Sequence, residues 1–121
     1  MKKNIALIDD DQYWLDWMES KIPNHNISKY IDWRTFYLNE NISDFHCIIT
    51  DFLFFGYNIE DTDIEKILKK SKFTGKIYLI THNPRDVKND EIFERIFDKG
   101  AIKRNKLFFL YRLYSYFKGN R

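Results

Sequence analysis

The chain has 121 residues, of which 44% are hydrophobic and 31% charged, and its net charge at pH 7 is +2. This length fits one domain, and the composition excludes a disordered chain. The single cysteine, Cys47, excludes an internal disulfide and a cysteine-rich zinc site. Because the sequence has neither a signal-peptide core nor a long apolar span, we expect a soluble cytoplasmic protein that does not bind a membrane.

Short apolar runs rich in β-branched residues alternate with helix-like stretches along the chain. Strands are predicted at residues 5–8, 28–33, 47–50, 77–80 and 96–97. Helices are predicted at residues 11–21, 34–43, 61–71 and 104–118, with a short one opened by Asn83-Pro84. Five strands alternating with about five helices predict an α/β fold with a doubly wound parallel sheet and helices on both faces.

Three of the predicted helices carry apolar faces, one of them at residues 61–71 with Ile64, Ile67 and Leu68. In residues 11–21, Trp14, Leu15 and Met18 fall at helical spacing. The helix at 104–118 has the strongest pattern, an apolar stripe formed by Leu107, Leu110, Tyr111, Tyr114 and Phe117. Half of its rings are expected against the sheet, and the others on a dimer or partner surface.

Polar residues of particular types follow the predicted strands. Asp9 and Asp10 follow the first, Asp51 the third, Thr81 the fourth and Lys99 the fifth. In an open parallel sheet, ligands bind beyond the carboxyl ends of the strands, so these side chains should converge. Three carboxylates repel one another unless they share a cation, and Mg²⁺ prefers such oxygen ligands. A hydroxyl and an ammonium can bind a phosphoryl group that an aspartate accepts as a nucleophile.

The segments IALIDDD, CIITDFLF, YLITHN and FDKG resemble, in this order, the receiver domain of two-component response regulators, the CheY-like single-domain form in particular. The resemblance covers essentially the whole chain, residues 1–121. It implies a flavodoxin-like sheet of order 2-1-3-4-5, with Asp51 as the phosphoacceptor. It also implies that Asp10 binds Mg²⁺ directly, Asp9 binds it through water, and the Leu53 carbonyl is a further ligand. Thr81 and Lys99 would contact the phosphoryl group.

The same resemblance implies a signalling role and not an enzyme acting on its own substrate. A sensor histidine kinase or phosphotransfer protein would phosphorylate Asp51 with Mg²⁺. No output domain is expected, so output would pass through contact with a downstream protein that the sequence does not identify. A homodimer through the fourth helix, fifth strand and fifth helix is a further expectation.

The chain departs from the receiver pattern in the parts that relay a signal. His82 stands where a small residue is usual, and Ile96 where an aromatic residue is usual. Lys99 follows Thr81 by only 18 positions, which predicts a shortened fourth helix. These departures leave open a degenerate receiver that acts only as a binding module.

A second alternative is a phosphatase of the haloacid-dehalogenase type. Asp9 and Asp11 have its D-x-D spacing after the first strand, with Asp9 as the nucleophile. This assignment leaves Asp51 without a role, and no acidic pair follows Lys99.

Basic charge is concentrated at the end of the sequence. Residues 101–121 hold six Lys or Arg and no acid, which leaves 14 basic against 18 acidic residues elsewhere, a net charge of −4. This basic charge fits a solvated helix face, and it also fits binding to an acidic partner, an anionic membrane or nucleic acid. Nucleic acid is not expected, because no recognition motif accompanies the charge.

Overall fold

The computed structural model describes residues 2–51, 53–54, 57–58, 61–87 and 90–119. The strands are β1 (Asn4–Ile8), β2 (Asn26–Tyr30), β3 (Cys47–Asp51), β4 (Leu53–Phe54), β5 (Tyr57–Asn58), β6 (Lys76–Thr81) and β7 (Arg95–Asp98). The α-helices are α1 (Gln12–Lys21), α2 (Trp33–Asn39), α3 (Asp61–Lys70), α4 (Lys99–Arg104) and α5 (Lys106–Gly119). Three short 3-10 helices are η1 (Ile42–Asp44), η2 (Pro84–Asp86) and η3 (Asp90–Ile92).

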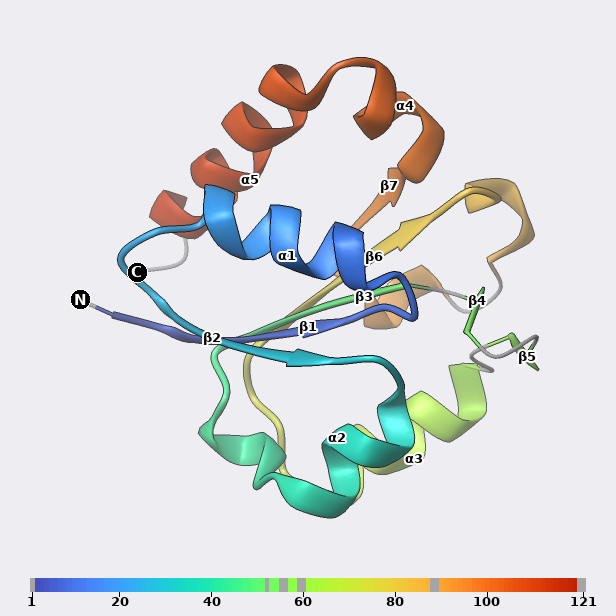
Figure 1. Ribbon diagram of the computed structural model, residues 1–121. Coiled ribbons are helices and arrows are strands. Elements are labelled where there is room, and N and C mark those ends of the chain that lie inside the picture. Colours follow the sequence, from blue (N-terminus) through green and yellow to red (C-terminus); the bar gives the residue numbers. More distant parts are fainter. Residues whose placement is uncertain (1, 52, 55–56, 59–60, 88–89, 120–121) are drawn as a thin grey trace.

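Five of the strands form one parallel sheet in the order β2-β1-β3-β6-β7. Counted along the chain, this is the order 2-1-3-4-5, and it confirms the predicted doubly wound sheet. Helices α1 and α5 cover one face of the sheet, and α2 and α3 cover the other (Figure 1). The short strands β4 and β5 form a separate antiparallel pair after β3, which the sequence did not predict.

The core consists of two clusters, one on each face of the sheet. Successive residues of β1 alternate between them: Ile5 and Leu7 pack with α1 and α5, whereas Ala6 and Ile8 pack with α2. This alternation follows from the two-residue period of a strand. A strand buried on both faces therefore has a continuous apolar sequence, which is the pattern that predicted the sheet.

The first helix begins where the sequence predicted. Asp11 is its N-cap and accepts a hydrogen bond from the Trp14 backbone N–H at 3.3 Å. Trp14, Leu15 and Met18 are all buried, so the predicted apolar face of α1 is confirmed.

The second strand and helix lie a few residues before their predicted positions. β2 ends at Tyr30 instead of residue 33, because the side chain of Asp32 caps α2 by accepting from the Thr35 backbone N–H at 2.6 Å. Trp33 is therefore the first residue of α2, where it is buried, and is not a strand residue. α2 ends at Asn39, short of the predicted residue 43.

The segment between β6 and β7 agrees with the shortened fourth helix that the spacing between Thr81 and Lys99 predicted. Its described residues contain only the 3-10 helices η2 and η3 in place of a full fourth helix. Asn83 precedes η2 and Pro84 is its first residue, as expected from the Asn-Pro pair.

The helix predicted at 104–118 is broken at its start. Asn105 ends α4 and caps α5 by accepting from the Phe108 backbone N–H at 3.1 Å, and Asp98 caps α4. The additional helix α4 was not predicted.

The predicted apolar stripe of this helix faces solvent over most of its described length. Leu107, Tyr111 and Tyr114 are 81%, 69% and 41% exposed, whereas Phe109 and Leu113 are buried against the sheet. The Phe117 side chain lies outside the described residues. None of the helices in the described ranges is long and apolar enough to cross a membrane.

Candidate metal centre

Three carboxylates meet at the carboxyl end of the sheet. Asp9 follows β1 directly, and Asp51 is the last residue of the neighbouring strand β3. One carboxylate oxygen from each of Asp9, Asp10 and Asp51 lies within 4.8 Å of the others. Asp9 and Asp51 are buried and Asp10 is exposed. The sheet thus brings the predicted acid cluster together, with one member open to solvent.

The Lys99 ammonium is the cation of this cluster. Lys99 is the first residue of α4, just after β7, and is 4% exposed. Its Nζ donates to Asp9 Oδ2 at 2.7 Å and to Asp51 Oδ2 at 3.4 Å. The ammonium is therefore closer to Asp9 than to the predicted phosphoacceptor.

Burial and charge shift the pKa of both partners in the closer pair. Burial raises the pKa of Asp9 to about 6, and the hydrogen bond from Lys99 offsets only part of that rise. Burial alone would lower the pKa of Lys99, but its hydrogen bonds to Asp9 and Asp51 and their negative charges together outweigh burial, so the pKa is raised and the ammonium stays charged. Among the residues that the structure describes, the Lys99 ammonium does not balance the three carboxylates, and the excess negative charge fits a divalent cation. Oxygen ligands of this kind suit Mg²⁺.

Thr81 ends its strand as predicted, and Leu53 lies in a short strand that was not predicted. Thr81 is the last residue of β6 and is buried, and its Oγ1 accepts a hydrogen bond from the Asn83 backbone N–H at 3.1 Å. Leu53 begins β4, two residues after Asp51. Its role as a carbonyl ligand stays a prediction.

Asp11 and His82 lie near the cluster without joining it. The Asp11 carboxylate caps α1, and the Asp11 backbone N–H donates to Asp9 Oδ1 at 2.9 Å. It thereby orients Asp9 and is not among the three clustered acids. His82 follows β6 and is exposed.

Two tryptophans border the site on opposite faces of the sheet. The Lys99 Nζ lies 5.4 Å from the centroid of the Trp14 ring. On the other face, Trp33 Nε1 donates to the buried Thr50 Oγ1 at 2.8 Å, next to Asp51. The sequence analysis placed Trp14 in the core but missed its contact with Lys99. The sequence signal that could have revealed this contact is the position of Trp14 in the first turn of a helix that begins just after Asp9 and Asp10.

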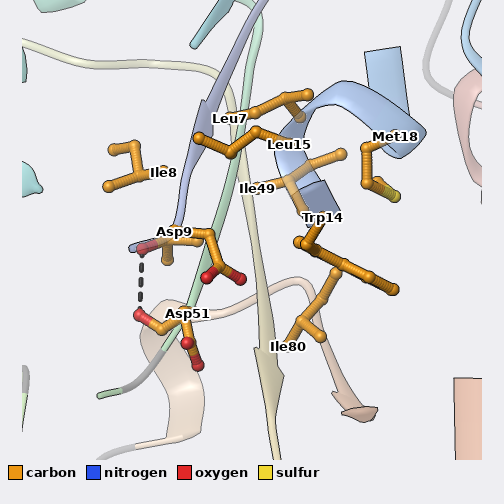
Figure 2. Close-up of a pocket in the computed structure, with 10 residues that line it drawn as sticks. Leu7, Ile8, Asp9, Trp14, Leu15, Met18, Ile49, Asp51 and Ile80 are labelled. Carbon is orange, nitrogen blue, oxygen red and sulfur yellow. Dashed lines mark hydrogen bonds between the residues drawn. The ribbon is translucent and has the colours of Figure 1, made fainter. Parts of the chain in front are cut away.

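A small pocket lies beside Asp9 and Asp51. Figure 2 shows Asp9 and Asp51 at the ends of their strands, with Trp14 of α1 nearby, among apolar side chains that include Leu7 and Ile80. Its cavity volume is about 10 Å³, enough for about one water molecule. This pocket is therefore too small for an organic substrate or cofactor.

The comparisons with known proteins found similarity in structure only. No known family model matches the sequence, and no curated protein does. Among solved structures, a CheY-like response regulator receiver domain from Methylobacillus flagellatus has a TM-score of 0.65 at 9% identity, over 82% of this chain and 87% of that one. The BeF3-activated DrrB receiver domain has a TM-score of 0.70 at 19% identity, over 98% of this chain and 99% of that one.

A longer protein also matches. The response regulator RcsB, solved in complex with DNA, has a TM-score of 0.62 at 23% identity, over 80% of this chain and 52% of that one. Identities this low establish the fold and not the activity. By its sheet order and by these matches, the chain has the fold of the receiver domains of response regulators.

Proposed function

We propose that this chain is a phosphoacceptor signalling module that is phosphorylated on Asp51 with Mg²⁺. The observation that carries the proposal is the joint placement of Asp51 with two further carboxylates within 4.8 Å and the Lys99 ammonium at 3.4 Å. The phosphodonor would be a phosphohistidine of a sensor histidine kinase or phosphotransfer protein. We place this exchange in the cytoplasm, and the free, buried Cys47 is compatible with a reducing compartment.

The transfer itself is a displacement at phosphorus. An Asp51 carboxylate oxygen attacks, the new P–O bond forms as the donor's P–N bond breaks, and the imidazole leaves with the electron pair and takes up a proton. Asp9, Asp10, Asp51 and the Leu53 carbonyl would hold Mg²⁺, which supplies positive charge to the phosphoryl oxygens.

Lys99 and Thr81 would bind the transferred group. The Lys99 ammonium now lies nearer Asp9, at 2.7 Å, so a phosphoryl group on Asp51 would draw it across the site. The Thr81 hydroxyl can rotate to donate to a phosphoryl oxygen while its own oxygen keeps the bond from Asn83.

The downstream partner would bind the exposed face of α5. This face presents Leu107, Phe108, Tyr111 and Tyr114 to solvent. The expected dimer surface of fourth helix, fifth strand and fifth helix needs revision, because the described residues between β6 and β7 form only 3-10 helices. We therefore propose α5 as the principal contact for a second copy or for a downstream protein.

The geometry favours this function over the phosphatase. A phosphatase with Asp9 as nucleophile needs Asp11 at the reacting group, but the Asp11 carboxylate accepts from the backbone of α1. Asp51, which that mechanism leaves idle, lies within the acid cluster.

The proposal is tested with beryllofluoride, a phosphoryl mimic, and with acetyl phosphate, a small phosphodonor. We expect Mg²⁺-dependent binding of beryllofluoride by calorimetry, and an acyl phosphate trapped at Asp51 and located by mass spectrometry. Asp51→Asn should abolish both signals. A wild-type protein that shows neither would be a binding module without phosphotransfer, whereas an acyl phosphate on Asp9 would indicate the phosphatase.

A further inference from the structure

Trp14 forms one wall around the Lys99 ammonium. The ring is 5% exposed, and its centroid lies 5.4 Å from Lys99 Nζ. The same nitrogen donates to Asp9 and Asp51. The ammonium is therefore bounded by carboxylates and by the ring of Trp14. Because an aromatic ring attracts a cation, and the more strongly when water is excluded, this ring restricts where the ammonium can lie.

The ring of Trp14 is in turn stacked on a second tryptophan of α1. The centroids of Trp14 and Trp17 are 5.2 Å apart, with an angle of 28° between the ring planes. Lys106 Nζ lies 5.0 Å from the centroid of the Trp17 ring. Lys106 is the first residue of α5. A continuous line of contacts therefore runs from the acid cluster through Lys99, Trp14 and Trp17 to the start of α5.

Charge added at Asp51 would act directly on this line. Phosphorylation replaces the single charge of the Asp51 carboxylate with about two negative charges on the phosphoryl group, close to the Lys99 ammonium. Movement of the ammonium toward Asp51 changes its contact with the Trp14 ring. The two stacked rings share one packed environment with α5, since Phe109 and Leu113 belong to the same core cluster as Trp14.

We propose that Trp14 is the positioning residue for Lys99, and that the Trp14–Trp17 stack transmits a change at Lys99 to the first turn of α5. This inference rests on the proposed function and adds a route from the site to the helix that bears the exposed apolar face. An alternative route exists through the chain itself, because Lys99 and Lys106 are joined by α4. The experiment must therefore separate the ring contacts from the covalent connection.

The first measurement needs no ligand. Labelling with 5-fluorotryptophan gives one ¹⁹F resonance for each of the three tryptophans, which Trp→Phe substitutions assign. Lys99→Met removes the ammonium and keeps the length of the side chain. We expect the Trp14 resonance to shift most, that of Trp17 to follow, and that of Trp33, on the other face of the sheet, to stay nearly unchanged. An unmoved Trp14 resonance would overturn the positioning role.

The second measurement follows the first turn of α5. Lys99→Met should shift the backbone amide resonances of residues 106–109, and the shift should vanish when the same substitution is made in Trp17→Leu. A shift of equal size in the Trp17→Leu background would assign the coupling to α4 and refute the route through the rings. Thermal unfolding of each variant shows that the comparison is made on folded protein.

The third measurement ties the inference to phosphoryl binding. Trp14→Leu should weaken Mg²⁺-dependent beryllofluoride binding about three- to tenfold, and Trp14→Phe, which keeps a ring, should restore most of the loss. Phe36→Leu removes a buried ring from the other face of the sheet and serves as the matched control. An equal loss in Phe36→Leu would reduce Trp14 to a packing residue. If the wild-type protein binds no beryllofluoride, the proposed function fails, while the first two measurements still decide the role of Trp14.

Discussion

Asp9 lies in surroundings that oppose its negative charge. It is buried, Asp51 is close by, and its pKa is raised to about 6. The native state therefore holds a proton on Asp9 between its ordinary pKa of 3.8 and about 6, where the unfolded chain has lost it. The resulting stabilisation is complete below pH 3.8 and is lost as the pH rises to about 6.

This difference predicts a pH-dependent effect of Asp9→Asn in the absence of metal. Relative to that variant, the wild type should lose up to about 3 kcal/mol of unfolding free energy between pH 3.8 and pH 6. Urea denaturation in EDTA at several pH values measures the two free energies. A constant difference across this range would show that Asp9 titrates normally.

A substitution of Asp10 should weaken Mg²⁺ binding without destabilising the fold. Asp10→Asn should remove most of the increase in Tm that Mg²⁺ gives the wild type, which corresponds to about 2.7 kcal/mol at a hundredfold excess over Kd. Without Mg²⁺ its Tm should match or exceed that of the wild type, because one of three clustered carboxylates is gone.

Asp11→Asn is the matched control for this measurement. It makes the same change of charge one residue along, and asparagine caps a helix about as well as aspartate does. Differential scanning fluorimetry with and without Mg²⁺ compares the two variants. An equal loss of the Mg²⁺ response in both would mean that general charge, and not ligation by Asp10, is responsible.

At the scale of elements, α2 is linked to β3 by a buried hydrogen bond from Trp33 to Thr50. Trp33→Phe should cost about 2 kcal/mol, because it leaves the Thr50 hydroxyl oxygen without its indole donor. In Trp33→Phe/Thr50→Val both polar partners are gone, so the double variant should be more stable than the sum of the single costs predicts. Chemical denaturation of the four proteins of this cycle gives the coupling energy. A value near zero would show that the bond contributes nothing.

Most elements could be predicted from the sequence because each carries a local signal. Strands such as β1 are continuous apolar runs that end at a polar residue, and α1 has a cap followed by a buried face. The same reasoning predicted the site, because parallel strands bring Asp9 and Asp51 to one edge. The orientation of α5 could not be predicted in this way. Its residues are apolar nearly all round, so periodicity does not select which face meets the sheet.

The break between α4 and α5 could not be predicted, because it depends on which residues cap the two helices. Asn105 lies within a stretch of good helical pattern, and the break there shows in the structure as a non-helical backbone at Asn105 and a side-chain bond to the Phe108 backbone. The contact between Lys99 and Trp14 joins residues on two different helices, so no local pattern reports it.

At the scale of the whole molecule, α5 has an exposed apolar side and a buried apolar side, and substitutions on the two should differ in their effect on stability. Leu107→Ser and Tyr111→Ser on the exposed side should change the unfolding free energy by less than about 0.5 kcal/mol. Leu113→Ala on the buried side should cost about 3 kcal/mol. Urea denaturation measures both, and a large cost at Leu107 or Tyr111 would mean that the two sides have been assigned the wrong way round.

The charge around this face predicts how its contacts respond to salt. Lys103, Arg104 and Lys106 are exposed beside it, and residues 101–121 contain no acid. A second copy of the chain would bring like charges together, so a homodimer through α5 should strengthen as salt rises. Sedimentation velocity at about 50 and about 500 mM NaCl, the low and high ends of screening, measures this. Dimerisation that weakens with salt would exclude a symmetric α5 contact.

The uneven balance of charge at the acid cluster has a kinetic consequence. Counted over the described residues, three carboxylates against the Lys99 ammonium leave a formal charge of −2 when all are ionised. Phosphodonors are anions, and such a site repels them until a divalent cation has cancelled its charge. For the proposed phosphotransfer we therefore expect the cation to bind first and the donor second. The local Mg²⁺ concentration then sets how often an encounter with the donor is productive.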